Sequence, residues 1–262
     1  MADTGEITLK TDVGGLRAVD MQYRGIREIE TGSIAFFQSA TKLNTPGLGT
    51  LAPETFRPVA ELSKQSITLF ELEMEQAIET MGKLKERDFY FRWLSEYMPM
   101  NYLMERACET RLVSYIDEKG VDSNRLCFEL SPLILRDGNM QVARVIANLR
   151  NRGFHFLITD FGGTRSPLMR LSDFQVDYVI LSRELTGYIG KSERSNAALH
   201  SVIQFVNGLG ADTIADGISN ATQAEILYQN ECRYVAGPLA GKYTAERYLR
   251  KKTDAILEEE NT

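Results

Sequence analysis

Acidic side chains follow three of the apolar runs that have the pattern of buried strands. Glu129 lies near the end of RLCFEL, Asp160 near the end of HFLITDF, and Asp216 directly after TIA. In an α/β barrel the carboxyl ends of the strands meet at one mouth, so we expect these three carboxylates there. A two-metal phosphodiester hydrolase needs several converging carboxylates, because each Mg²⁺ takes about six oxygen ligands. Three acids with no lysine among them are a thin set for that chemistry.

The other predicted strand ends carry side chains that are poor metal ligands. Thr159 precedes Asp160, where a metal site favours a second carboxylate. Trp93 has only an N–H donor and cannot ligate a metal ion. The whole set at these ends, besides the three acids, is Gln38, Trp93, Thr159, Ser182 and Ala236.

These positions need a scaffold of strands and helices. Eight β-branched or aromatic runs are strand candidates, and they cover residues 26–30, 33–40, 89–94, 125–130, 155–161, 178–182, 213–217 and 234–237. With helical patterns between most of them, they predict a (β/α)8 barrel. Only Thr31-Gly32 separates the first two runs, which predicts a hairpin and hence antiparallel first strands. A doubly wound open sheet is the alternative, but the chain has no glycine-rich nucleotide motif to support it.

The segments between the strands carry apolar residues at helical spacing. In one of them the apolar positions are Ile67, Phe70, Met74, Ile78 and Met81. The acidic positions of the same stretch predict a solvated helix face, and they are Glu71, Glu73, Glu75 and Glu79.

Composition excludes several classes of function. The net charge is −6 and the pI about 5.2, which argues against binding to a nucleic acid polymer. No apolar stretch is long enough to cross a bilayer, and the first residues do not have the pattern of a signal peptide, so we expect a cytoplasmic location without a membrane partner. The three cysteines and two histidines lack the spacing of a zinc site. We expect a flexible segment over 1–17, one barrel domain over 18–250 and an acidic tail over 251–262.

Several motifs, in order, resemble those of the EAL domain family of cyclic di-GMP phosphodiesterases. YRGIREIETGSIAFFQSA is similar to the family's opening YQPIVDLxTGxxxGxEAL, and KLNTPGLGTLAPETFRPVAE is similar to its RWxHPxxGxxxPxxFIxxAE. DFGGTRSPL resembles DDFGTGxSSL, and TIADGISNATQ resembles VxAEGVETxxQ. The resemblance runs from about Tyr23 to Tyr243 and implies an EAL-type modified TIM barrel whose first strands are antiparallel.

The resemblance also implies a role for individual positions. Glu129 and Asp160 keep the family's acidic residues, and other positions differ from the family. These are Gln38 for the Glu of EAL, Trp93 for the Asn of NLS, Thr159 for the first Asp of DDFG, Ile180 and Ser182 for the Lys and Asp of KID, Asp216 and Ser219 for the two Glu of AEGVE, and Ala236 for the Gln of QG. The comparison implies a degenerate member that is not an enzyme and has no metal cofactor, with Mg²⁺ or Ca²⁺ at Glu129, Asp160 and Asp216 as the residual metal site.

We therefore expect a catalytically inactive regulatory module that binds a protein partner in bacterial signalling. The alternatives are a receptor that binds cyclic di-GMP without hydrolysing it, and a weak metal-dependent phosphodiesterase. A bound ligand would contact Lys42, which replaces a phosphate-binding Arg of the family, together with Trp93, Asp160 and Arg165. Trp93 would stack on a guanine base, unless it fills the vacated cavity instead. The family resemblance also implies a homodimer.

Overall fold

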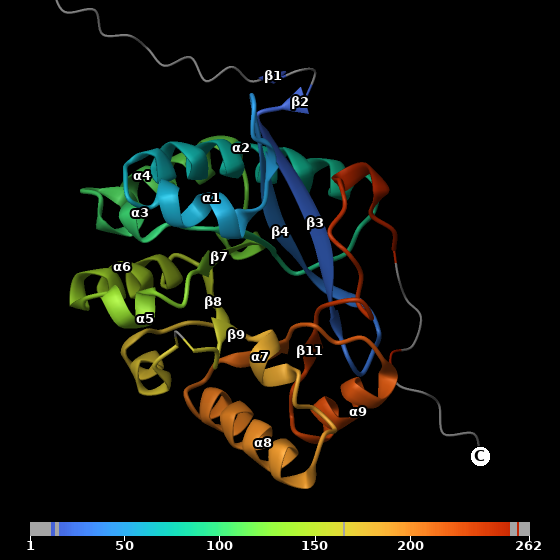
Figure 1. Cartoon of the computed structure of the whole chain (residues 1–262). Coiled ribbons are helices and arrows are strands. Elements are labelled where there is room, and N and C mark those ends of the chain that lie inside the picture. Colours follow the sequence, from blue (N-terminus) through green and yellow to red (C-terminus); the bar gives the residue numbers. More distant parts are fainter. Residues whose placement is uncertain (1–11, 14–15, 165, 252–255, 257–262) are drawn as a thin grey trace, which may run out of the picture.

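The computed structural model describes residues 12–13, 16–164, 166–251 and 256. Its centre is a closed barrel of eight strands (Figure 1). In chain order these are β3 (Val19–Glu28), β4 (Ile34–Thr45), β6 (Leu94–Tyr97), β7 (Leu126–Leu130), β8 (His155–Phe161), β9 (Tyr178–Leu181), β10 (Asp212–Ala215) and β11 (Tyr234–Val235).

The strand order confirms the predicted barrel and its reversed first strand. Around the barrel the order is β3-β11-β10-β9-β8-β7-β6-β4, and the pairing of β3 with β4 closes it. β3 is antiparallel to both of its neighbours, whereas the other pairs are parallel. The open-sheet alternative is therefore wrong. Gly32 has a φ of 66° in the turn between β3 and β4, a conformation that suits glycine.

Two small strand pairings lie beside the barrel. β5 (Gly49–Leu51) pairs only with the far end of β4, and β1 (Asp12–Val13) pairs with β2 (Leu16–Arg17). The predicted segment 1–17 and tail 251–262 lie mostly outside the described residues. No helix of the described part of the chain is long and apolar enough to cross a membrane.

Helices lie around the outside of the barrel (Figure 1). They are α1 (Pro53–Ala60), α2 (Gln65–Glu86), α3 (Met100–Met104), α4 (Cys108–Lys119), α5 (Ile134–Asp137), α6 (Met140–Arg150), α7 (Arg183–Thr186), α8 (Glu193–Gly208) and α9 (Ala221–Gln229), with short 3-10 turns η1 (Ser123–Arg125), η2 (Leu168–Asp173) and η3 (Glu246–Tyr248).

Apolar side chains form two cores, as expected for strands whose alternate residues face opposite sides of the wall. The larger core lies between the wall and the helices, and Phe70 and Met74 of α2 belong to it. The smaller core fills the inside of the barrel and consists of Ile26, Ala35, Phe36, Trp93, Cys127, Leu157, Ile180, Ile214, Tyr234 and Ala236. The barrel is thus packed, and its chemistry is confined to the mouth above this filling.

Several strand boundaries differ from the prediction, and those of β6 and β3 are among them. The aromatic run 89–94 is mostly a loop, and the strand begins only at Leu94. Phe89 and Phe91 pack against Phe37 from that loop, with ring centroids 5.8 and 5.2 Å apart, so their burial does not require a strand. β3 starts at Val19, seven residues before the predicted run, and its first residues alternate between buried and half-buried, a strand pattern that the prediction missed.

Asp177 joins α6 to the amino-terminal ends of β8 and β9, away from the mouth. Its carboxylate accepts hydrogen bonds from Arg150 Nη2 at 2.6 Å and from the Phe156 amide at 2.9 Å. Burial alone would raise the pKa of Asp177, but hydrogen bonds from His155, Arg150 and the Phe156 amide lower it to about 2.

We expect Asp177→Asn to lower the free energy of unfolding at pH 7 by about 2 kcal/mol, the equivalent of the pKa shift. Because the pKa is lower in the folded state, this contribution is complete above the unfolded-state pKa and is lost as pH falls from about 4 to about 2. Urea unfolding of both proteins across this pH range measures it. A difference that persists unchanged at pH 2 would contradict the assignment.

Candidate functional site

Arg24 lies at the centre of a polar cluster in the barrel mouth. The side chain projects from β3, is 5% exposed and faces Gln38 across the β3–β4 ladder. Arg24 Nε and Nη2 both donate to Gln38 Oε1, at 2.9 and 2.6 Å, and Nη1 donates to Asp216 Oδ1 at 2.7 Å. The Tyr243 ring lies 4.7 Å from the guanidinium carbon. The guanidinium is therefore held on several sides by groups that favour its charge.

Gln38 links this arginine to Glu129 of β7. Gln38 Nε2 donates to Glu129 Oε2 at 3.1 Å, and Ser95 Oγ of β6 donates to Glu129 Oε1. Burial raises the pKa of Glu129, and the hydrogen bonds from Ser95 and Gln38 only partly oppose this. Glu129 thus binds a proton more readily than an ordinary carboxylate.

Asp216 lies directly after β10 and binds a second arginine, Arg183 of α7. Arg183 Nε donates to Asp216 Oδ2 at 2.9 Å, and its side chain is 68% exposed. Asp216 Oδ1 also accepts the Gly217 amide at 2.8 Å. Burial disfavours the carboxylate, but Arg24 and Arg183 outweigh it and lower the pKa of Asp216.

The charges in this cluster favour an anion at the mouth. Two arginines, Arg24 and Arg183, share one firmly ionised carboxylate, Asp216, while the raised pKa of Glu129 favours its neutral form. The net charge of these four side chains is therefore neutral or positive. A guanidinium also binds a phosphodiester through two parallel hydrogen bonds.

The same cluster does not fit the divalent metal that the family resemblance implies. Gln38, Glu129 and Asp216 take the implied ligand positions, but all three are engaged in the network around Arg24. A dication about 4 Å from a guanidinium would be repelled by roughly 8 kcal/mol at an effective dielectric constant of about 20. Among the described residues, no group of three His, Cys, Asp or Glu side chains is placed to hold a metal ion, and the residual metal site at Glu129, Asp160 and Asp216 stays a prediction.

Trp93 lies deeper than the predicted position at a strand end. It precedes β6, is fully buried, and stacks on Phe36 with ring centroids 3.9 Å apart. Ile180 lies in the same inner core. Trp93 therefore packs the barrel in this structure and has no face open to a base. Ser95, two residues later on the same strand face, is the β6 residue at the mouth.

The other predicted site residues serve the backbone or lie apart. Thr159 Oγ1 donates to the Leu130 carbonyl at 3.3 Å, and Ser182 Oγ caps α7 by accepting the Leu185 amide at 3.2 Å. Asp160 is exposed, with a φ of 53°, at an irregularity in the β8–β9 ladder. Ser219 is exposed and donates to Gln223, and Ala236 is buried in the inner core.

The two predicted cationic ligand contacts have different outcomes. Lys42 is half-buried on β4, on the same strand face as Gln38 and four residues further along, beyond the β4–β6 pairing. Arg165 lies outside the described residues. Arg24, Ser95 and Arg183 were not predicted. A signal for Arg24 exists in the sequence, because a hairpin turning at Thr31-Gly32 places it close to Gln38.

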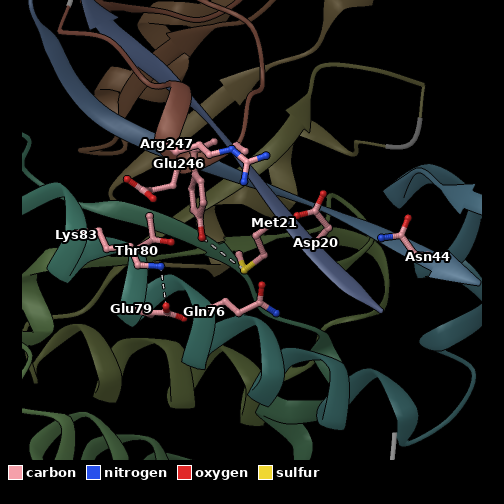
Figure 2. Close-up of a pocket in the computed structure, with 11 residues that line it drawn as sticks. Asp20, Met21, Asn44, Gln76, Glu79, Thr80, Lys83, Glu246 and Arg247 are labelled. Carbon is pink, nitrogen blue, oxygen red and sulfur yellow. Dashed lines mark hydrogen bonds and ion pairs between the residues drawn. The ribbon is translucent and has the colours of Figure 1, made fainter. Parts of the chain in front are cut away.

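A cavity of about 450 Å³ lies apart from this cluster. Residues of β3, α2 and the segment around η3 line it, including Asp20, Thr80 and Glu246 (Figure 2). Lys83 in its lining is paired with Glu79 at 2.6 Å. No member of the Arg24 cluster is among the residues that line it.

Comparison with known proteins supports the family resemblance. The family model described as "EAL domain" matches residues 14–243. The cyclic di-GMP phosphodiesterase RocR of Pseudomonas aeruginosa is 23% identical over 221 residues, which cover 84% of this chain and 56% of that protein. The chain spans 25 to 37% of the length of the first curated relatives it matches.

Solved structures show the same fold. The PaMucR phosphodiesterase, in a c-di-GMP complex, matches with a TM-score of 0.77 and 16% identity over 88% of this chain and 94% of that one. The FimX EAL domain from Pseudomonas aeruginosa, bound to c-di-GMP, matches with a TM-score of 0.77 and 14% identity over 91% and 94%.

The expectation that the chain is not an enzyme is wrong in the light of these comparisons. The family model, RocR and the PaMucR structure all point to a family of enzymes. Substitutions at single positions of a motif do not by themselves remove a chain from such a family.

Proposed function

Because this chain belongs to the EAL domain family, we propose that its barrel mouth recognises cyclic di-GMP and that Arg183 contacts a phosphodiester group of this dinucleotide. The observation that supports this most directly is the state of Arg183. Its Nε is fixed by Asp216, while its side chain is largely exposed. Within the described part of the chain, its two Nη atoms make no hydrogen bond or ion pair. An oriented guanidinium with two free donor groups suits a phosphodiester.

Two further observations support the same ligand. The solved FimX and PaMucR domains, which share this fold, are bound to c-di-GMP. Two arginines of the mouth, Arg24 and Arg183, share the single carboxylate of Asp216. An anionic dinucleotide is therefore a better match for this mouth than a cationic or neutral ligand.

We expect Arg183→Ala to weaken cyclic di-GMP binding by about 10- to 100-fold, because loss of hydrogen bonds to a charged group costs about 1.5–3 kcal/mol. Isothermal titration calorimetry of the wild type and the variant measures this effect. Chromatography of the same mixtures shows whether a linear product forms.

Arg152→Ala is the matched control. Arg152 is an exposed arginine just before β8, at the opposite end of the barrel from the mouth, and should leave the affinity unchanged. If the wild type takes up no cyclic di-GMP in either EDTA or Mg²⁺, the proposed function fails. If Arg183→Ala binds as tightly as the wild type, the role of Arg183 fails while recognition stands.

A regulatory role through a protein partner is the second candidate function. Large apolar side chains are exposed in one stretch that includes the β4–β5 turn and α1, namely Leu48 (76%), Val59 (67%) and Leu62 (86%). Exposed apolar surface of this kind is characteristic of protein contacts. A second copy of the chain would be detected by sedimentation velocity, and the homodimer stays a prediction.

A further inference from the structure

Three of the positions that the family resemblance assigns to metal binding converge on a side chain of the protein itself. Gln38 and Asp216 both bind the Arg24 guanidinium directly, and Glu129 binds it through Gln38. Arg24 stands where the family's opening motif YQPI has Gln. The same hairpin therefore carries two differences from the family, a gained cation at position 24 and a lost carboxylate at position 38.

These two differences change the charge in the same direction, and together they replace the charge that a divalent metal ion would bring. A carboxylate at position 38 would add one negative charge, and glutamine removes it. Arginine at position 24 adds one positive charge, which Asp216 and the Gln38 amide oxygen accept at hydrogen-bond distance. The donors that remain lack the several free carboxylates that Mg²⁺, Ca²⁺ or Mn²⁺ requires.

Burial makes this cation a fixed part of the mouth. Arg24 is 5% exposed and has the Tyr243 ring against it, and Arg183 meets it through the shared carboxylate of Asp216. An arginine cannot lose its proton in a protein, so its charge does not depend on metal supply or on pH.

We propose that the Arg24 guanidinium is the built-in cation of the barrel mouth, which takes the place of a divalent metal ion and allows the mouth to bind its anionic ligand without metal. The part that concerns the ligand rests on the proposed recognition of cyclic di-GMP. The part that concerns the metal stands on the contacts of Arg24 alone.

The metal part is tested with MnCl₂ as the probe, by calorimetry and by thermal unfolding. The wild type and Gln38→Glu should show no saturable Mn²⁺ binding, because Arg24 is still present in both. The double variant Arg24→Gln/Gln38→Glu restores the family's residues at these two positions, which removes the cation and adds a carboxylate, and it should acquire saturable Mn²⁺ binding with a raised melting temperature. Adding Asp216→Asn to the double variant should abolish it, which locates the ion at the mouth.

Saturable Mn²⁺ binding by the wild type that Asp216→Asn removes would overturn the proposal, and so would a folded double variant that binds no Mn²⁺. If the double variant does not fold, the wild type alone decides. Its dissociation constant for cyclic di-GMP should differ by less than about twofold between EDTA and Mg²⁺, and tightening of more than about tenfold by Mg²⁺ would overturn the proposal.

The two proposals can fail separately. Metal-dependent binding of cyclic di-GMP by the wild type would leave the proposed function intact and remove the built-in cation. If the wild type binds no cyclic di-GMP and the double variant gains Mn²⁺ binding, the proposed function fails and the built-in cation stands.

Discussion

Arg24→Met is expected to lower the free energy of unfolding by about 3–5 kcal/mol, because it breaks a buried ion pair and leaves the buried acceptors around it without their donor. Arg24 and Asp216 are 5% and 15% exposed, and the substitution also removes both donors to Gln38 Oε1. Methionine nearly fills the space of the arginine stem, so the loss reports on hydrogen bonds and charge more than on packing. Equilibrium unfolding in urea at pH 7 measures it.

Arg183 supplies a matched control on the same carboxylate. It binds the other oxygen of Asp216 but is largely exposed, so Arg183→Met should cost only about 0–1 kcal/mol. In a double-mutant cycle, Arg24→Met and Asp216→Asn should couple strongly. A loss for Arg24→Met no larger than that for Arg183→Met would show that the buried guanidinium is not what holds the mouth together.

Arg57→Met is expected to have an effect of similar size, about 3–5 kcal/mol, by the same mechanism at a different place. Arg57 of α1 donates to the fully buried Glu73 of α2 at 2.9 Å and stacks over the Tyr97 ring at 3.9 Å. Burial raises the pKa of Glu73, and the charge of Arg57 is the largest influence that opposes this rise.

A second buried carboxyl adjoins this pair, and within the described ranges of the chain no salt bridge joins it to a cation. Glu96 of β6 accepts Ser39 Oγ at 3.1 Å, and burial together with the nearby charge of Glu73 raises its pKa well above the ordinary value. Burial therefore disfavours the charged form of Glu96, while Glu73 is paired directly with the Arg57 guanidinium.

The double variant Arg57→Met/Glu73→Gln should recover most of the stability lost in Arg57→Met, because no charge is then left unpaired. The exposed pair of Lys64 with Glu105 is the control, and Lys64→Met should cost at most about 1 kcal/mol. No recovery in the double variant would mean that Arg57 acts by packing on Tyr97 instead of by charge.

The sequence by itself determined the barrel and the direction of its first strand. Apolar runs between helical patterns require a structure that buries the strands on both sides, and the short Thr31-Gly32 connection admits only a hairpin. The motifs around Asp160 and Asp216 identified the family, because each motif is a short run of neighbouring residues in the chain. These features depend on neighbouring residues, and a linear pattern records them.

Only the tertiary structure decided what the mouth and the buried charges do. The helical pattern predicts that Glu73 lies on the solvent-exposed face of the helix with Glu71, Glu75 and Glu79. In the structure α1 covers Glu73, and Arg57 of α1 forms an ion pair with it.

The stagger of the strands around the barrel places Ser95 at the mouth and Trp93 deeper, in the inner core. Arg24 became its central cation because the strands bring position 24 beside Asp216, 192 residues away in the sequence. Contacts between distant segments depend on register and closure of the barrel, which no single stretch of the sequence specifies.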